Sequence, residues 1–253
     1  MAASVDTLLD RILGSLLPPR CVLCSGRGQR PCLDLCADCQ GELPVLACAC
    51  LGCGLPRATS PEGDPPDASE PLHDGTACPA CRQHPPPYDR CFAACSYAHP
   101  VDAMVQALKY GDQLAVGRVL GEVLARGVEA FGLHLDVDCL LPVPLHPRRL
   151  AERGYNQSAE IARHVARRLG RPVEPRLARR VGETRPQVGL PLIDRRANVE
   201  GAFRVERTSV VGRRVVVVDD VVTTGSTVAE LARELRRAGA VSVDVWCVAR
   251  ALD

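Results

Sequence analysis

Blocks of apolar residues alternate with amphipathic segments from about Tyr88 to the end of the chain. Short, continuous apolar runs at residues 139–143 and 215–218 and a largely apolar segment at residues 241–248 predict strands, and the four consecutive valines of 215–218 suit a strand covered on both faces. Before and between these segments, apolar residues recur at the spacing of a helix face. They are Val101, Met104, Val105 and Leu108, then Ile161, Val165 and Leu169, then Val228, Leu231, Ala232 and Leu235. The alternation predicts an α/β fold with about five parallel strands, which binds its ligand at their carboxyl ends.

Three segments depart from this pattern. Residues 4–17 carry apolar side chains at helical spacing and stop at a double proline, which predicts an amino-terminal helix. Its polar face has no cluster of Lys or Arg, so we expect it to dock on the protein itself rather than on a membrane surface. Residues 54–77 are rich in Pro, Asp, Glu, Gly and Ser, which predicts a flexible surface insertion. Residues 181–203 lack clean periodicity and predict a long loop.

Pro85-Pro86-Pro87 falls between a cysteine-rich part and the alternating part of the chain. Consecutive prolines are typical of a stiff linker. We therefore expect two units. Residues 1–82 would form the amino-terminal helix and a small cysteine-rich module, and residues 88–253 would form the α/β domain.

The apolar run at residues 215–218 is followed at once by Asp219 and Asp220 and then by the small polar residues 223–227. Because burying unpaired carboxylates is costly, we expect the two acids at the end of the strand, at the edge of a crevice. Hydroxyls and closely spaced N–H groups at the start of the next helix would favour a phosphate. The segment predicts a phosphate cradle beside two acceptors for sugar hydroxyls; the alternative is an ordinary corner with solvated acids. It contains neither a Walker A loop nor a dinucleotide fingerprint.

The composition and charge of the chain exclude some classes of function. The net charge of +1 excludes a strong overall basic field, and 3% aromatic residues weaken any base-stacking surface. No apolar stretch is long enough to span a membrane, and charged residues interrupt the amino-terminal apolar run, so we expect a cytoplasmic protein without membrane insertion. In a reducing compartment, 14 cysteines indicate metal binding rather than disulfides.

Four Cys-x-x-Cys pairs lie in the first 82 residues, and two such pairs complete a tetrahedral zinc site. The simplest grouping places Cys21, Cys24, Cys36 and Cys39 in one site and Cys50, Cys53, Cys78 and Cys81 in the other. Closed four-thiolate sites are structural, and so small a segment would hardly fold without metal. The alternative ligands are Cys32, Cys48, His73 and His84, and the 54–77 insertion makes the second site less secure. Cys91, Cys95, Cys139 and Cys247 are better interpreted as small apolar core residues.

Two arginine-containing segments are candidate anion sites. Arg148, Arg149 and Arg153 follow the predicted strand 139–143, where guanidinium groups would suit pyrophosphate; a solvated basic turn is the alternative. A second set lies in the irregular stretch before residue 215, where a loop could close over a charged substrate or simply cover the surface. Its members are Thr184, Arg185, Gln187, Arg195 and Asn198.

The segment from Asp219 to Thr227 resembles the signature with which type I phosphoribosyltransferases bind 5-phosphoribosyl-1-pyrophosphate (PRPP). The resemblance assigns Asp219 and Asp220 to the ribose hydroxyls. It assigns the 5′-phosphate to Thr223, Thr224, Gly225, Ser226 and Thr227. Together with Lys109-Tyr110-Gly111-Asp112, Pro142-Val143-Pro144, Arg153-Gly154-Tyr155-Asn156-Gln157 and Arg195-x-x-Asn198-Val199, this order of motifs is similar to the ComF family. That family joins an amino-terminal double zinc ribbon to a phosphoribosyltransferase-like domain and is linked to natural competence and the handling of incoming single-stranded DNA.

Two functions follow from this resemblance. The first is Mg²⁺-dependent transfer of phosphoribosyl from PRPP to an acceptor, with catalysis by positioning and charge stabilisation. The second is a non-catalytic module that senses PRPP or a related phosphate and binds single-stranded DNA or a competence protein. The sequence names no acceptor and no oligomeric state, and it leaves open whether the chain is an enzyme. Release of pyrophosphate from PRPP would discriminate between the two.

Overall fold

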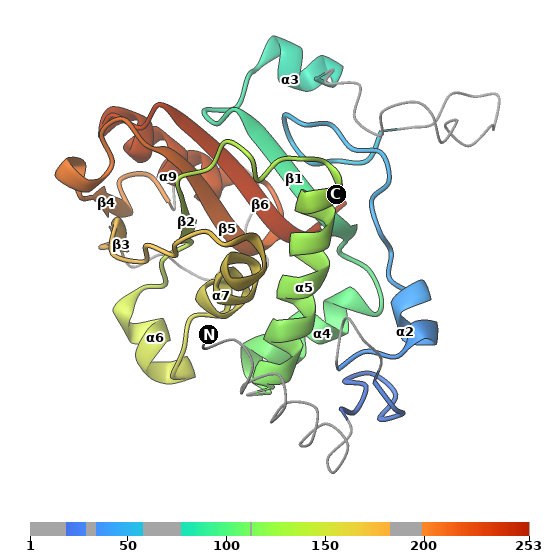
Figure 1. Cartoon of the computed structure of the whole chain (residues 1–253). Coiled ribbons are helices and arrows are strands. Elements are labelled where there is room, and N and C mark those ends of the chain that lie inside the picture. The colour runs from blue at the N-terminus through green and yellow to red at the C-terminus, as the bar shows by residue number, and fades with distance from the viewer. Residues whose placement is uncertain (1–18, 29–33, 58–76, 112, 183–198, 253) are drawn as a thin grey trace, which may run out of the picture.

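The computed structural model describes residues 19–28, 34–57, 77–111, 113–182 and 199–252. At its centre lies a sheet of four parallel strands in the order β1, β6, β5, β2 (Figure 1). The strands are β1 (Arg90–Ser96), β2 (Cys139–Pro142), β5 (Arg214–Val222) and β6 (Ser242–Arg250). Beyond β2, Val173 makes a single parallel bridge to Leu140. The predicted parallel sheet flanked by helices is confirmed, and β1 is the strand that the apolar pattern did not indicate.

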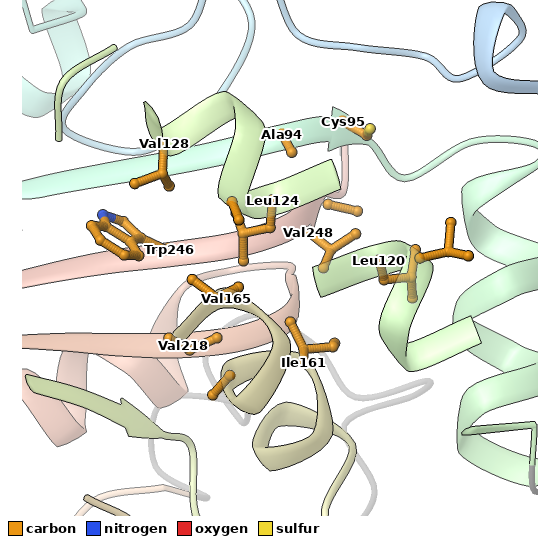
Figure 2. Packing of buried hydrophobic residues seen from close by; sticks show 14 of the residues in the cluster. Ala94, Cys95, Leu120, Leu124, Val128, Ile161, Val165, Val218, Trp246 and Val248 are labelled. Carbon is orange, nitrogen blue, oxygen red and sulfur yellow. The ribbon is translucent and has the colours of Figure 1, made fainter. Parts of the chain in front are cut away.

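Helices cover both faces of the sheet (Figure 1). On one face lie α4 (Val101–Tyr110), α5 (Leu114–Ala130) and α7 (Gln157–Leu169), and on the other lies α9 (Ser226–Arg237). Figure 2 shows the first face, where side chains of α5 and α7 pack on β5 and β6. The labelled residues there include Leu120, Leu124, Ile161, Val165, Val218, Trp246 and Val248. No helix in the described part of the chain is long and apolar enough to cross a bilayer.

The valine run of β5 is buried on both faces because successive side chains of a strand point to opposite sides. Val216 and Val218 belong to the core that contains α5 and α7. Val215 and Val217 belong to the core that contains α9. The strand then continues through Asp219 and Asp220 to Val222, so the expectation that the strand ends at the two acids is wrong.

Shorter elements complete the described chain. They are α2 (Ala37–Gly41), α3 (Pro79–Gln83), α6 (Pro147–Arg153), β3 (Ala178–Arg180), β4 (Phe203–Val205) and a 3₁₀ turn (Arg207–Ser209). β3 and β4 form an antiparallel pair beside α9. Phe203, which the sequence placed at the end of a loop, begins β4, and residues 183–198 of that loop lie outside the described residues.

The cysteine-rich segment packs on the outer edge of β1. Backbone hydrogen bonds join Leu46 to Ala94 (3.0 Å) and Cys91 to Leu51 (2.6 Å), and Val45 bridges Cys95 in antiparallel fashion. Cys21, Leu35, Cys39 and Leu43 share the core of α4, α5 and α7. The division at residues 82–88 stays a prediction, and the expected helix 4–17 and most of the 54–77 insertion lie outside the described residues.

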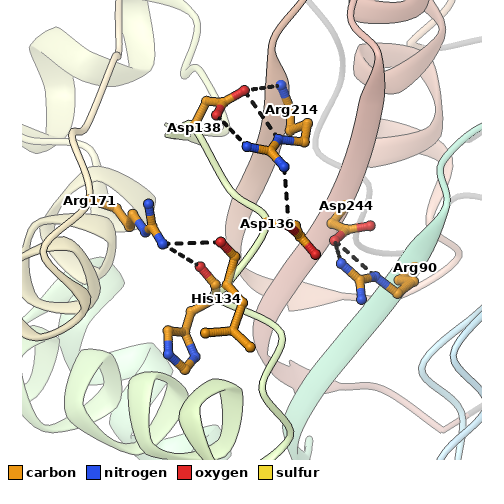
Figure 3. Close-up of polar contacts among 8 residues, drawn as sticks. Arg90, His134, Asp136, Asp138, Arg171, Arg214 and Asp244 are labelled. Carbon is orange, nitrogen blue, oxygen red and sulfur yellow. Dashed lines mark hydrogen bonds and ion pairs between the residues drawn. The ribbon is translucent and has the colours of Figure 1, made fainter.

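Ion pairs connect the segments at the amino-terminal ends of the strands (Figure 3). Arg214, the first residue of β5, donates from its backbone and side chain to Asp138 and pairs with Asp136 at 3.1 Å. Arg90 of β1 donates twice to Asp244 of β6. We call these residues, which lie where the strands begin, the amino edge of the sheet.

Candidate functional site

The loop from Thr223 to Thr227 joins β5 to α9 and lines an open hollow of about 220 Å³. Gly225 precedes the helix with a φ of +77°, a left-handed conformation that L side chains rarely adopt. The Thr224 hydroxyl lies 2.9 Å from the Ser226 hydroxyl and accepts from the Ser226 N–H at 3.3 Å. The hollow thus lies at the start of a twelve-residue helix, where the first backbone N–H groups lack helical partners and favour an anion.

Asp219 and Asp220 are both buried inside the carboxyl half of β5. Lys109, from the last turn of α4, forms an ion pair with Asp220. Asp219 accepts from the Ser158 hydroxyl at 2.9 Å and from the Asp220 N–H at 3.0 Å. These partners, of which Lys109 and Ser158 come from distant parts of the chain, compensate the burial that the sequence argument treated as prohibitive.

The two carboxyl groups have opposite electrostatic surroundings. Burial, followed by the neighbouring Asp220 charge, raises the pKa of Asp219 well above its ordinary value. Burial also opposes ionisation of Asp220, but the Lys109 ammonium outweighs it and lowers the pKa of Asp220. Only Asp219 of the pair lines the hollow. Among the described residues, the acid that faces the hollow is therefore the one without an ion-pair partner.

The start of α7 positions Ser158. The Asn156 side chain caps this helix by accepting from the Ser158 and Ala159 N–H groups. Its amide nitrogen also donates to the Val143 carbonyl at 2.9 Å, just after β2. β2 ends at Pro142, which pairs with Val218 of β5. Asp219, the next residue of β5, therefore has no β2 residue opposite it, and the start of α7 contacts it instead through Ser158.

The predicted arginines separate in the structure. Arg148, Arg149 and Arg153 all lie on α6. Arg153 stacks over the Tyr110 ring at 5.4 Å and bonds to Gln157, which ties it to the protein. Arg149 lies close enough to Arg180 of β3 to help burial lower the pKa of that guanidinium, whereas the Asp219 charge raises it. Arg180 therefore lies within electrostatic reach of both Arg149 and Asp219.

Several predicted positions lie outside the described residues. They are Thr184, Arg185, Gln187, Arg195, Asn198, Cys32 and His73. The assignments of the remaining residues to PRPP stay predictions. Lys109, Ser158 and Arg180 join the candidate site in the structure, although the sequence interpretation gave none of them a role in PRPP binding. Lys109 was visible only as part of a family motif, Arg180 only as part of the arginine-rich stretch 176–185, for which the sequence suggests a nucleic-acid contact, and Ser158 carried no local signal.

The eight cysteine thiols form two groups in the predicted pairing. The first cluster is Cys21, Cys24, Cys36 and Cys39, and the second cluster is Cys50, Cys53, Cys78 and Cys81. Within each cluster all four Sγ atoms lie within 4.8 Å of one another. The Cys24–Cys36 and Cys53–Cys78 Sγ distances are 3.7 and 3.9 Å. A tetrahedron with Zn–S bonds of about 2.3 Å has edges of about 3.8 Å, so both groups could hold zinc.

Backbone N–H groups prepare each cluster for a cation. Cys50 Sγ accepts from the N–H groups of Gly52 (3.3 Å) and Cys78 (3.2 Å). Burial opposes ionisation, but such backbone bonds lower the pKa of Cys50 to about 7 and that of Cys21 to about 6. Neither Cys48 nor His84 joins a cluster in the described part. Four other cysteines are buried core residues, as predicted: Cys91, Cys95, Cys139 and Cys247.

A family profile described as the phosphoribosyl transferase domain matches residues 156–253, from the start of α7 to the end of the chain. The chain is 35% identical over 240 residues to the DNA utilization protein YhgH of Salmonella typhimurium, covering 93% of this chain and 99% of that protein. It is 32% identical over 238 residues to Competence protein F of Haemophilus influenzae, covering 92% and 97%. This chain belongs to the ComF family.

The ComF-family chain is also 28% identical over 165 residues to the amidophosphoribosyltransferase of Escherichia coli. That match covers 64% of this chain but 29% of that enzyme, so it concerns one portion of the larger protein. The predicted fold class is confirmed as a whole: a phosphoribosyltransferase-like parallel sheet flanked by helices and an amino-terminal module with two four-cysteine clusters.

Proposed function

We propose that this ComF-family chain binds PRPP and Mg²⁺ and transfers the phosphoribosyl group to an acceptor. The observation that carries the proposal is the position of Asp219, a buried carboxyl that lines the same hollow as the residues at the start of α9. The raised pKa of Asp219 indicates a carboxylate that ribose hydroxyls or a cation would stabilise. The hollow thus combines an anion site at the start of α9 with a carboxylate, Asp219, that can bind hydrogen-bond donors or a cation, so one ligand could reach both.

Each residue has a proposed task in this reaction. The N–H groups and hydroxyls from Thr223 to Thr227 hold the 5′-phosphate, and Asp219 and Asp220 hold the ribose. When the bond between C1 and the pyrophosphate oxygen breaks, positive charge develops on the ribose and negative charge on the leaving group. Arg149 and Arg180 would stabilise the departing pyrophosphate. Positioning and electrostatics suffice, and no covalent protein nucleophile is required.

The donor set fits Mg²⁺, which proteins hold through one or two carboxylates together with substrate phosphate oxygens. Asp219 is the available carboxylate, since Asp220 already binds Lys109. Bound Mg²⁺ would supply positive charge to pyrophosphate and ribose oxygens. The two cysteine clusters would hold structural Zn²⁺, because four thiolates leave no open position for a substrate.

Calorimetry with PRPP and Mg²⁺ tests the binding part of the proposal. We expect the variant Asp219→Asn/Asp220→Asn to bind PRPP at least about tenfold more weakly than the unmodified protein, as hydrogen bonds to charged groups disappear. Asp138→Asn, which changes a carboxyl at the amino edge, is the matched control and should bind normally. Equal affinity of the double variant and the unmodified protein would refute the proposal.

A second candidate function is a non-catalytic module that senses PRPP and binds single-stranded DNA or a competence partner. It is favoured by the names of the relatives, which refer to DNA utilization and competence, and by the exposed Arg148, Arg176 and Arg179. Pyrophosphate release in the presence of an acceptor panel would support the enzyme. PRPP binding without release, together with salt-dependent single-strand binding in an anisotropy assay, would support the module.

A further inference from the structure

Arg250, the last residue of β6, is a charged side chain that is only 5% exposed. A buried cation needs partners that replace its hydration. Its Nε donates to the Cys53 carbonyl at 2.8 Å. Its Nη1 contacts the carbonyls of Val222 (3.0 Å), Thr223 and Ala251 (2.9 Å). One planar guanidinium therefore connects a turn of the second cluster with the first residues of the 223–227 loop.

The neighbouring packing keeps these two segments in contact. Gly54, which follows Cys53, has a φ of +71°, and a Cβ there would lie 3.1 Å from Cys91 Sγ and 3.6 Å from Arg250 Cδ. On the loop side, a Cβ at Gly225 would lie 3.8 Å from the Tyr88 hydroxyl. Tyr88 is itself buried. The turn, the guanidinium and the loop thus form one closely packed unit.

The first cluster has no equivalent link among the described residues. The arginine that forms an ion pair with the segment of the first cluster is Arg118 of α5, which contacts the buried Asp34. Asp34 lies two residues before Cys36, and α5 contributes no residue to the hollow beside Asp219. Two clusters with the same ligands therefore differ in what their turns contact.

We propose that Arg250 is a positioning residue that holds the 223–227 loop against the turn of the second cluster. This inference rests on the proposed PRPP site, and it makes the conformation of that site depend on the second cluster. Metal bound at the second cluster fixes the Cys53 carbonyl, the carbonyl orients Arg250, and Arg250 orients the carbonyls of Val222 and Thr223. The N–H groups of the same loop then point at the phosphate. PRPP affinity should depend on the second cluster and be indifferent to the first.

The experiment compares Arg250→Met and Arg250→Lys with Arg118→Met in the full chain loaded with Zn²⁺. Amide hydrogen exchange at residues 222–226, measured without ligand, reports loop order, and calorimetry reports PRPP affinity in the presence of Mg²⁺. We expect Arg250→Met to speed exchange at the loop and weaken PRPP binding at least about tenfold. Arg250→Lys should fall between Arg250→Met and the unmodified protein, since an ammonium lacks the fork that spans both segments. Arg118→Met should match the unmodified protein.

A second pair of variants keeps the test decisive if Arg250→Met does not fold. Cys78→Ser weakens the second cluster and Cys36→Ser the first, and zinc content confirms the loss of one metal in each. Only Cys78→Ser should speed exchange at residues 222–226. Equal loop exchange in these two variants, or PRPP affinity unchanged in Arg250→Met, would overturn the inference. If the unmodified protein fails to bind PRPP, the proposed function fails, while the exchange comparison still decides the role of Arg250.

Discussion

The two edges of the central sheet carry similar charged side chains but neutralise them differently. At the amino edge, Asp138 bonds to Arg214 through both carboxylate oxygens, and Asp244 bonds to Arg90. Arg214 and Asp138 are partly exposed, with 43% and 36% of their side-chain surfaces accessible. Water therefore shares in solvating this pair, and each charge has an opposite charge beside it.

At the carboxyl edge, Asp219 and Asp220 are adjacent and buried, and the ammonium of Lys109 contacts Asp220. Lys109 neutralises Asp220, whereas Asp219 accepts hydrogen bonds from the Ser158 hydroxyl and the Asp220 N–H. The comparison teaches that carboxylates with their own guanidinium partner, whether partly exposed like Asp138 or buried like Asp244, are neutralised within the protein. A buried charge left short of a partner is a site at which a ligand gains free energy by binding.

The largest expected effect is that of Lys109→Met. The substitution leaves the Asp220 carboxylate buried without its cation, which should destabilise the protein by about 3–5 kcal/mol. Denaturant unfolding monitored by circular dichroism would measure this change. The double variant Lys109→Met/Asp220→Asn removes both charges and should recover most of the lost stability. A single variant as stable as the unmodified protein would contradict the view that this pair is energetically buried.

The acid pair also shows where sequence reasoning stopped. The valine run, the two acids and the small-residue loop predicted β5, the start of α9 and the candidate anion site, because all of these are local patterns. The burial of the acids depends on Lys109, which lies 111 residues before Asp220 in the chain, and no local pattern contains that contact.

α5 was missed for a different reason. Gly117, Gly121 and Gly127 interrupt its sequence and lower its helix propensity. The structure uses two of them for close packing: a Cβ at Gly121 would lie 2.6 Å from His164 Cβ, and one at Gly127 would lie 2.6 Å from Phe92 Cζ. Tertiary contacts, which the sequence does not display, convert weak helix formers into the residues that this helix requires.

An intermediate effect is expected for Asp219→Asn, with opposite signs for stability and binding. The folded protein raises the pKa of Asp219, so its contribution to stability is present at low pH and is lost as pH rises above about 4, through the folded pKa. At pH 7 the amide should therefore be more stable, by about 1 kcal/mol or 2–4 °C in Tm, while PRPP binding weakens. Thermal unfolding at pH 4 and pH 7 measures the difference, which should shrink at pH 4. A lower Tm at pH 7 would show that the carboxylate is satisfied without ligand.

The smallest effect is expected at the amino edge, where Arg214→Ala removes bonds to Asp136 and Asp138. Exposed ion pairs of this kind contribute little to stability, and salt weakens them. The folded protein lowers the pKa of Asp138, chiefly through its bonds to Arg214, so the stability that they add is present above about pH 4 and is lost as pH falls below it. This dependence of stability on pH has the opposite sign to that of Asp219.

Unfolding of Arg214→Ala in low and high salt should show a small loss of stability that shrinks with salt, and calorimetry should show unchanged PRPP affinity. A weakened affinity would mean that the two edges are coupled through β5, since this strand runs from Arg214 to the acid pair.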